Sequence, residues 1–251
     1  MYLTGKDVRQ KETFNLNWFF YLGEEEKTPG DKDTADYRPV KLPHDWSLEY
    51  PFEEDARSGG SGGYVRTGTG WYKKIFRVNP DAVKSKRAVL HFEGAYMLAQ
   101  VWLNGQSLGR HVYGYTPFEW DITDLLKTDG SENVVDVKVN NSAQPNSRWY
   151  SGSGITRNVW ICGMKDIHVA PYGVWIRQPE VSGEQAQIHM ETRVCVNHRN
   201  RAHGFICCKN LSFCIQSMLR PSGRSLTTWW RTTPLASIRK EPRRANRSGQ
   251  A

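Results

Sequence analysis

Apolar and polar residues alternate along several segments of the first 195 residues, and this period of two constrains the fold more than any other feature. In NVVDVKVNN, Val135, Val137 and Val139 alternate with Asp136 and Lys138. Because successive side chains of a strand point to opposite faces of a sheet, this pattern predicts half-buried antiparallel strands. We therefore expect an all-β chain, built as a β-sandwich with long loops.

Two further segments show the same alternation and define the expected core. The residues predicted to face inward are Tyr72, Phe76 and Val78 in GWYKKIFRV, opposite Lys73 and Arg77, and Ala88, Leu90 and Phe92 in RAVLHFEG. The tryptophans Trp46, Trp71, Trp102 and Trp120 are expected to fill the same core or its junction with a following domain.

Turn and helix signals are few. Asn104-Gly105 predicts a two-residue hairpin, since a type I′ turn needs positive φ at both central residues. Only DITDLLK suggests a short helix, with Asp121 or Thr123 as its cap.

The distribution of charge argues against nucleic-acid binding. The chain has a formal net charge of +8, from 34 basic and 26 acidic residues. From Arg199 to Ala251 there are 11 basic residues and one acidic residue, Glu241, so the remaining chain carries a slight negative excess. The whole basic excess thus lies in the last fifth of the chain, and no nucleic-acid partner is expected.

Neither a metal nor a cofactor is indicated. Four of the five cysteines lie near the basic tail, but their spacing, C-x11-CC-x5-C, is not that of a zinc finger or ribbon, so unpaired thiols are expected. The glycine-rich SGGSGG lacks the Gly-Lys-Ser/Thr and the following helix of a phosphate-binding loop. The sequence shows no apolar run of about 20 residues and no signal peptide at MYLTGKDVRQKETF, so no membrane association is expected.

After VWICG the pattern changes twice. The segment 168–173 (HVAPYG) reads as a linker, and Val174–Ile176 and residues 188–194 read as strands of a second β unit. Residues 198–251 then show no sustained period and are rich in Arg, Ser and Cys. Because Cys, Trp and Phe are uncommon in disordered arms, this segment fits neither globular nor disordered composition.

Five motifs, in order, carry a resemblance to a known family. They are KETFNLNWFFYLG, LPHDWSLEYPF, SGGSGGYVRTGTGWYKKIF, HFEGAYMLAQVWLNGQSLGRHVYGYTPFEWDITDLL and NSRWYSGSGITRNVWI. Over about residues 9–197 the chain resembles the N-terminal sugar-binding domain of glycoside hydrolase family 2, and within it the β-galactosidases of gut bacteria.

The resemblance implies a three-part architecture. Residues 9–165 would form a jelly-roll, galactose-binding-like β-sandwich, and residues 168–197 the start of an incomplete immunoglobulin-like β-sandwich. In this family a TIM barrel follows, with two glutamates about 5 Å apart that cleave the glycosidic bond with retention. Past Val196 only 55 residues remain, whereas a TIM barrel needs roughly 250. No catalytic residue is therefore assigned.

The tail has an economical explanation within this resemblance. Residues 198–251 have the composition of a coding frame read out of register, which predicts a disordered segment and a frameshift between about Thr192 and His203. A real, divergent basic tail is the alternative. Translating the underlying nucleotide sequence in its other two frames distinguishes them.

The candidate sugar-contacting residues lie in RWYSGSG and just before it. The family places this loop at the mouth of the active site, which makes Asn146, Arg148, Trp149 and Tyr150 the candidate substrate-binding residues, although Ser147 stands where some members have an acidic residue. Arg148 can donate to hydroxyls, and the two aromatic rings offer flat apolar faces. Alternatively, Trp149 packs in a domain interface and Arg148 pairs with an acid.

His44 and Asp45 in PHDW resemble a catalytic pair but are expected to be structural. Adjacent residues of an extended segment point to opposite sides, and no serine or cysteine nucleophile matches them. They are expected to hold their loop in place.

Together these observations predict the non-catalytic N-terminal portion of a β-galactosidase-like glycoside hydrolase, with a β-galactoside-type carbohydrate as its partner. A free-standing, lectin-like carbohydrate-binding module is the alternative. Family resemblance implies a periplasmic or secreted protein, although the chain shows no signal peptide, and nothing in the sequence indicates an oligomeric state.

Overall fold

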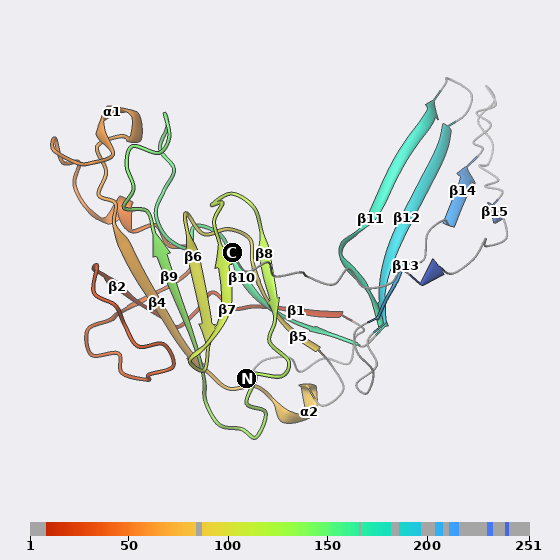
Figure 1. Cartoon of the computed structure of the whole chain (residues 1–251), viewed down its shortest axis with the longest axis horizontal. Coiled ribbons are helices and arrows are strands. Elements are labelled where there is room, and N and C mark those ends of the chain that lie inside the picture. Colours follow the sequence, from red (N-terminus) through yellow and green to blue (C-terminus); the bar gives the residue numbers. More distant parts are fainter. Residues whose placement is uncertain are drawn as a thin grey trace, which may run out of the picture. The chain divides into compact units, whose positions relative to one another are not determined.

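The computed structural model describes residues 9–83, 87–165, 167–181, 186–196, 204–207, 211–215, 230–232 and 239–240. The chain divides into two compact units, Met1–Lys165 and Asp166–Ala251. Strands dominate the described residues of both units, so the expectation of an all-β chain is confirmed (Figure 1).

The first unit contains two antiparallel sheets. One has the strand order β3-β2-β4-β9-β6-β7 and the other the order β1-β10-β5-β8. The strands of the six-stranded sheet are β2 (Trp18–Leu22), β3 (Arg38–Val40), β4 (Thr69–Phe76), β6 (Ala99–Leu103), β7 (Gln106–His111) and β9 (Asn133–Asn140). Those of the four-stranded sheet are β1 (Arg9–Thr13), β5 (Arg87–Phe92), β8 (Phe118–Asp121) and β10 (Val159–Met164). The described residues of this unit also form three short helices: the 3-10 helix η1 (Trp46–Glu49), α1 (Gly59–Gly62) and α2 (Pro80–Val83).

A single hydrophobic core joins the two sheets. Val135, Val137 and Val139 of β9 face it from the six-stranded sheet, and Leu90 and Phe92 of β5 face it from the other. Tyr72, Phe76, Val78 and Ala88 are also core residues, so the inward faces expected from the alternation are confirmed. The unit is a β-sandwich, because the apolar faces of two sheets bury each other.

The tryptophans follow the expectation to different degrees. Trp46 and Trp71 are buried, and Trp71 stacks on Trp102 with 5.6 Å between ring centroids. Trp102 and Trp120 are half-buried, and Trp120 packs against the core.

The outer face of the six-stranded sheet is not left to solvent. Lys73 and Asp136, which the alternation places on that face, lie opposite each other on β4 and β9 and are each 1% exposed. Lys73 Nζ donates to Asp136 Oδ1 at 2.7 Å, and the N–H of Gly30 donates to Asp136 Oδ2 at 2.7 Å. Lys73 also donates to the carbonyl of Asp31. The strands are therefore buried on both faces here, because the segment around residues 30–31 covers the ion pair.

The hairpin prediction is confirmed. β6 and β7 pair Leu103 with Gln106 across Asn104-Gly105, whose φ values are 51° and 83°. Both values lie in the left-handed region that a type I′ turn requires.

The short helix expected in DITDLLK is wrong. Asp121 ends β8, its Oδ1 accepts from the N–H of Thr123 at 3.0 Å, and only one turn follows, closed by Leu126 N–H donating to the Ile122 carbonyl at 3.0 Å. The N–H of Ala88 donates to Thr123 Oγ1 at 3.0 Å. This turn is therefore tied to β5 and does not continue as a helix.

The described strands of the second unit form one antiparallel sheet. Its order is β15-β14-β12-β13-β16, with β11 also paired to β12. The strands are β11 (Ile167–Val181), β12 (Ala186–Val196), β13 (Gly204–Cys207), β14 (Leu211–Ile215), β15 (Trp230–Thr232) and β16 (Arg239–Lys240). Figure 1 shows β11 and β12 as the two long strands of this unit.

The predicted linker at 168–173 is wrong, because these residues belong to β11. The register with β12 shifts between Val169 and Val174, and Tyr172 has a φ of 51°. Pro171 lies in this irregular stretch, where its missing N–H costs no regular ladder bond.

Four short segments of the tail are among the residues that the structure describes. β13, β14, β15 and β16 are extended and paired where the sequence shows no sustained pattern. The rest of residues 198–251 lies outside the described residues, so the out-of-register interpretation of the tail and the incomplete immunoglobulin-like domain stay predictions.

Candidate functional site

The segment RWYSGSG (148–154) lies between β9 and β10, and its second half is held between two other segments of the first unit. The N–H groups of His44 and Trp46 donate to the carbonyls of Ile155 and Ser153 at 2.9 and 3.1 Å. On the other side, Tyr96 and Gly154 exchange two backbone hydrogen bonds of 2.8 and 2.9 Å. Backbone pairing on both sides gives this loop one defined path.

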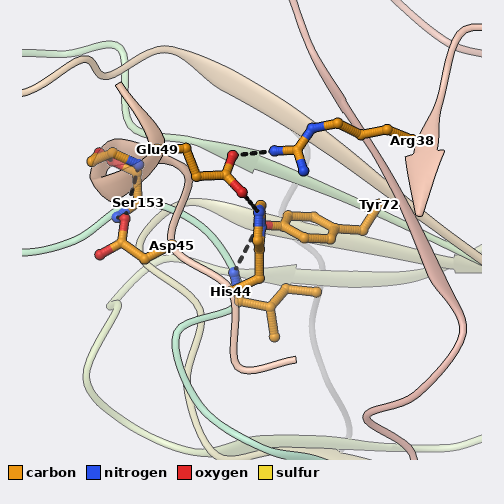
Figure 2. Close-up of polar contacts among 8 residues, drawn as sticks. Arg38, His44, Asp45, Glu49, Tyr72 and Ser153 are labelled. Atoms are coloured by element: carbon orange, nitrogen blue, oxygen red, sulfur yellow. Dashed lines mark hydrogen bonds and ion pairs between the residues drawn. The ribbon is translucent and has the colours of Figure 1, made fainter. Parts of the chain in front are cut away.

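Asp45 binds the loop through both carboxylate oxygens. Its Oδ1 accepts from the N–H of Ser47 at 3.0 Å and from the N–H of Ser153 at 2.9 Å (Figure 2). Its Oδ2 accepts a short hydrogen bond from the hydroxyl of Tyr150. Asp45 is also the N-cap of η1, so one side chain begins the helix and anchors the loop.

The glycines of the loop are required by these close approaches. Gly152 has a φ of +75°, and a Cβ there would lie 2.7 Å from Asp45 Oδ2. Gly154 has a φ of +125°, and a Cβ there would meet the hydroxyl of Tyr72 and lie 2.7 Å from the carbonyl oxygen of His44. Any larger residue would therefore push the loop away from the segment that holds it.

His44 extends the anchor into the core. Its Nε2 lies 3.0 Å from Glu49 Oε1, and its Nδ1 lies 2.7 Å from the hydroxyl of Tyr72 (Figure 2). Because a carboxylate only accepts, Nε2 carries the proton of the neutral ring, and the Tyr72 hydroxyl then donates to Nδ1. Glu49 also pairs with Arg38. Burial lowers the pKa of His44 below its ordinary value, against the opposing effect of Glu49.

The two neighbours thus point to different partners, as expected for an extended segment. His44 contacts Glu49 and Tyr72, whereas Asp45 contacts Tyr150 and Ser153. The prediction that the PHDW pair holds its loop in place is confirmed by these contacts.

Asn146 is held by a second anchor. Its Nδ2 donates to Asn141 Oδ1 at 2.7 Å, and its Oδ1 accepts from the hydroxyl of Tyr96 at 3.3 Å. Asn141 is buried and donates in turn to Ser153 Oγ at 2.8 Å. The amide of Asn146 is therefore largely committed to protein partners.

Trp149 joins a group of aromatic side chains from another loop. Its Nε1 donates to the hydroxyl of Tyr115 at 2.9 Å, although its side chain remains 60% exposed. Tyr115 contacts Tyr113 and Tyr96, with ring centroids 5.6 and 5.1 Å apart. Within the first unit Trp149 is thus a surface residue with a fixed polar edge and an exposed ring.

Arg148 and Tyr150 differ in the hydrogen-bonding groups that remain available to a ligand. Burial and the neighbouring Asp45 raise the pKa of the Tyr150 hydroxyl, which stays protonated and donates to that carboxylate. Arg148 is exposed, and no hydrogen bond or ion pair joins it to any other residue that the structure describes. Its five N–H donors therefore face solvent.

The structure brings the four predicted residues into one loop but gives them different surroundings. The sequence did not indicate three of their partners: Asp45 for Tyr150, Asn141 for Asn146 and Tyr115 for Trp149. Only Asp45 had a local signal, since an aspartate directly before a short helical segment is a typical cap.

Two further observations concern only the residues that the structure describes. Among these residues, no group of three or more His, Cys, Asp or Glu side chains is arranged to hold a metal ion. In the same part of the chain, no helix has the length and apolarity needed to span a bilayer.

Comparison with known proteins identifies the domain that bears this loop. Residues 60–168 match the family described as glycosyl hydrolases family 2, sugar binding domain. The chain carries a family 2 sugar-binding domain. The match includes RWYSGSG and most strands of the β-sandwich.

Curated relatives are longer glycosidases. The chain is 41% identical over 206 residues to the β-galactosidase BoGH2A of Bacteroides ovatus. The matched region covers 81% of this chain and 24% of that relative. It is 32% identical over 187 residues to a putative β-glucuronidase of Formosa agariphila, covering 74% of this chain and 18% of that protein. The chain thus spans about a quarter or less of these relatives.

Solved structures of related glycosidases share the fold of the family 2 domain of this chain. A glycosyl hydrolase family 2 member from Bacteroides cellulosilyticus matches with a TM-score of 0.67 and 36% identity, over 73% of this chain and 24% of that one. A β-glycosidase from Bacteroides vulgatus matches with a TM-score of 0.69 and 30% identity, over 76% and 25% of the two chains. The family 2 domain of this chain therefore shares both sequence and fold with the corresponding part of these enzymes.

Proposed function

We propose that this chain acts as the non-catalytic sugar-binding portion of a β-galactosidase-type glycosidase, and that Arg148 and Trp149 contact the terminal β-galactoside-type sugar. The similarity to the Bacteroides ovatus β-galactosidase supports the sugar class. The observation that carries the proposal is that the Arg148 guanidinium is exposed and bonds to no described residue, and that the next side chain, the Trp149 indole, is exposed as well.

The chemistry of these two side chains suits a sugar. A pyranose presents hydroxyl groups at its rim, which accept from a guanidinium, and apolar C–H faces, which pack on an aromatic ring. Because the Trp149 N–H already donates to Tyr115, what the indole offers a ligand is its flat face.

The anchors of the loop support a binding role as well. Tyr150 and Asn146 lie on either side of Arg148 and Trp149 and are tied to Asp45 and Asn141. A loop whose flanking residues are fixed loses little conformational entropy when a ligand binds. Tyr150 and Asn146 therefore act mainly by holding the other two in position.

Affinity is expected to be weak. A monosaccharide has about 12 heavy atoms, and at roughly 0.3 kcal/mol each the binding free energy is about 4 kcal/mol, or a Kd near 1 mM. The estimate of about 1 mM assumes a complete pocket, whereas the loop forms one wall of a site. A loss of about 1.4 kcal/mol of contact energy raises the Kd about tenfold, to about 10 mM.

Titration with galactose, followed by tryptophan fluorescence or NMR, tests the proposal in the wild-type chain and in Arg148→Ala and Trp149→Ala. Millimolar binding that both substitutions abolish is the expected result. Micromolar binding that survives both would contradict the loop assignment and favour a free-standing, lectin-like module.

A further inference from the structure

Trp149 belongs to a group of aromatic side chains that come from two segments of the chain. Tyr115 accepts from the indole N–H of Trp149 at 2.9 Å, and Tyr113 packs edge-on against Tyr115 with 5.6 Å between centroids. We refer to Tyr113, Tyr115 and Trp149 as the aromatic ledge. It joins two segments of the family 2 domain that are distant in sequence.

The ledge is exposed to solvent on one side and packs on the buried Tyr96 through Tyr115. Tyr113 and Trp149 are 59% and 60% exposed, while Tyr115 is half-buried and packs on the buried ring of Tyr96. Tyr96 is itself fixed by two backbone hydrogen bonds to Gly154 and by its hydroxyl, which donates to Asn146. The rings therefore keep their positions in the absence of a ligand.

The chemistry of the ledge favours a sugar over an ionic ligand. Its three members carry no formal charge, and the hydrogen bond between Trp149 and Tyr115 uses the indole N–H, so flat faces are the main surface presented. Flat aromatic faces bordered by hydroxyl groups match the apolar faces and polar rim of a sugar ring.

Among the described residues Tyr113 has no ring contact with Trp149 and is linked to it through Tyr115, so we expect one sugar ring stacked on Trp149 to leave Tyr113 uncovered. We infer that the aromatic ledge, through Tyr113, holds a second ring of a β-linked disaccharide or longer glycan whose terminal sugar contacts Arg148 and Trp149. This inference rests on the proposed sugar contact and extends it from a monosaccharide to an oligosaccharide.

NMR titration of the chain with galactose and with lactose, a β-linked disaccharide with a terminal galactose, tests the ledge. The wild-type chain is expected to bind lactose about threefold to tenfold more tightly than galactose, since a stacked aromatic contact contributes about 0.5–1.5 kcal/mol. Tyr113→Ala removes this preference without changing the affinity for galactose. Tyr113→Phe, which keeps the ring, retains most of it.

Val112→Ala is the matched control, because Val112 is a half-exposed neighbour without a ring, and it is expected to bind both sugars as the wild type does. If both sugars bind but Tyr113→Ala leaves the lactose preference intact, or the wild type has no preference, the ledge inference is wrong while the proposed sugar contact stands. If neither sugar binds, both are wrong.

Discussion

The hydroxyl of Tyr150 donates to the carboxylate of Asp45, 105 residues earlier in the chain. The other oxygen of that carboxylate accepts from the N–H of Ser153, so Asp45 fixes the candidate loop on both sides of Ser151. The position of the candidate loop is thus decided by a residue outside it.

Asp45→Ala is expected to lower the free energy of unfolding by about 2–3 kcal/mol, because it removes the cap of η1 and leaves the buried N–H of Ser153 without its acceptor. Urea denaturation measures the change. Asp45→Asn keeps an acceptor oxygen for the two N–H groups and should lose less than half as much. Equal losses in the two variants would show that acceptance at Oδ1 is not what stabilises the loop.

Stability should also depend on the protonation of His44. Burial lowers the pKa of this histidine in the folded state, so below the ordinary value of about 6.5 the unfolded chain binds the proton more tightly and the stabilising contribution is lost as pH falls. Glu49, Asp45, Arg38 and Tyr72 are the titratable or charged groups that act on it.

His44→Gln separates this contribution from the general effect of acid. The variant should be less stable than the wild type at about pH 8, and the difference should shrink towards pH 5.5 because only the wild type has the buried imidazole. Urea denaturation across this range measures it. A difference that stays constant or grows as pH falls would contradict the assignment of a neutral His44.

The buried ion pair of Lys73 and Asp136 lies on the outer face of the six-stranded sheet. The loss of stability on removing Asp136 should depend on whether the Lys73 ammonium remains. Asp136→Ala leaves the Lys73 ammonium buried without its counter-ion and should cost about 3–5 kcal/mol, whereas the double variant Lys73→Met, Asp136→Leu should recover most of the loss. Arg77→Ala is the control, since its pair with Glu132 is exposed and contributes at most about 1 kcal/mol. Similar costs for Asp136→Ala and Arg77→Ala in thermal denaturation would refute the account.

The purified 251-residue chain is expected not to hydrolyse β-galactosides. It spans about a quarter or less of the glycosidases that it resembles, and Asp45, a carboxylate that contacts the loop, already accepts from three hydrogen-bond donors. A chromogenic galactoside assay, with the Asp45→Asn variant as a control for residual activity, measures it. Turnover above buffer that is reproduced by independent preparations would falsify this prediction.

Alternation of apolar and polar residues predicted the inward faces of the sandwich, because the apolar side of each strand faces the same core. Val135, Val137 and Val139 needed no knowledge of the remaining chain. Lys73 and Asp136 could not be predicted in the same way, since their burial depends on a distant segment that folds over the outer face. The hairpin at Asn104-Gly105 was predictable because its φ angles are a local property.

The candidate site was predictable only as a segment. The motif RWYSGSG and the family resemblance located the loop. Which residues remain open to a ligand depends on long-range partners, such as Tyr115 for Trp149, that no local pattern encodes. The linker expected at 168–173 failed for a related reason, because pairing with β12 extends the strand through Pro171.

The indole N–H of Trp149 offers the most direct test of the proposed sugar contact. In an NMR titration of the labelled chain, its resonance is identified by its absence in Trp149→Phe and is then followed as galactose is added. The account predicts a saturable shift of this resonance with a Kd of about 10 mM, lost in Arg148→Ala, while the indole signals of the buried Trp46 and Trp71 stay in place. Saturable galactose binding that leaves the Trp149 signal unmoved would contradict it.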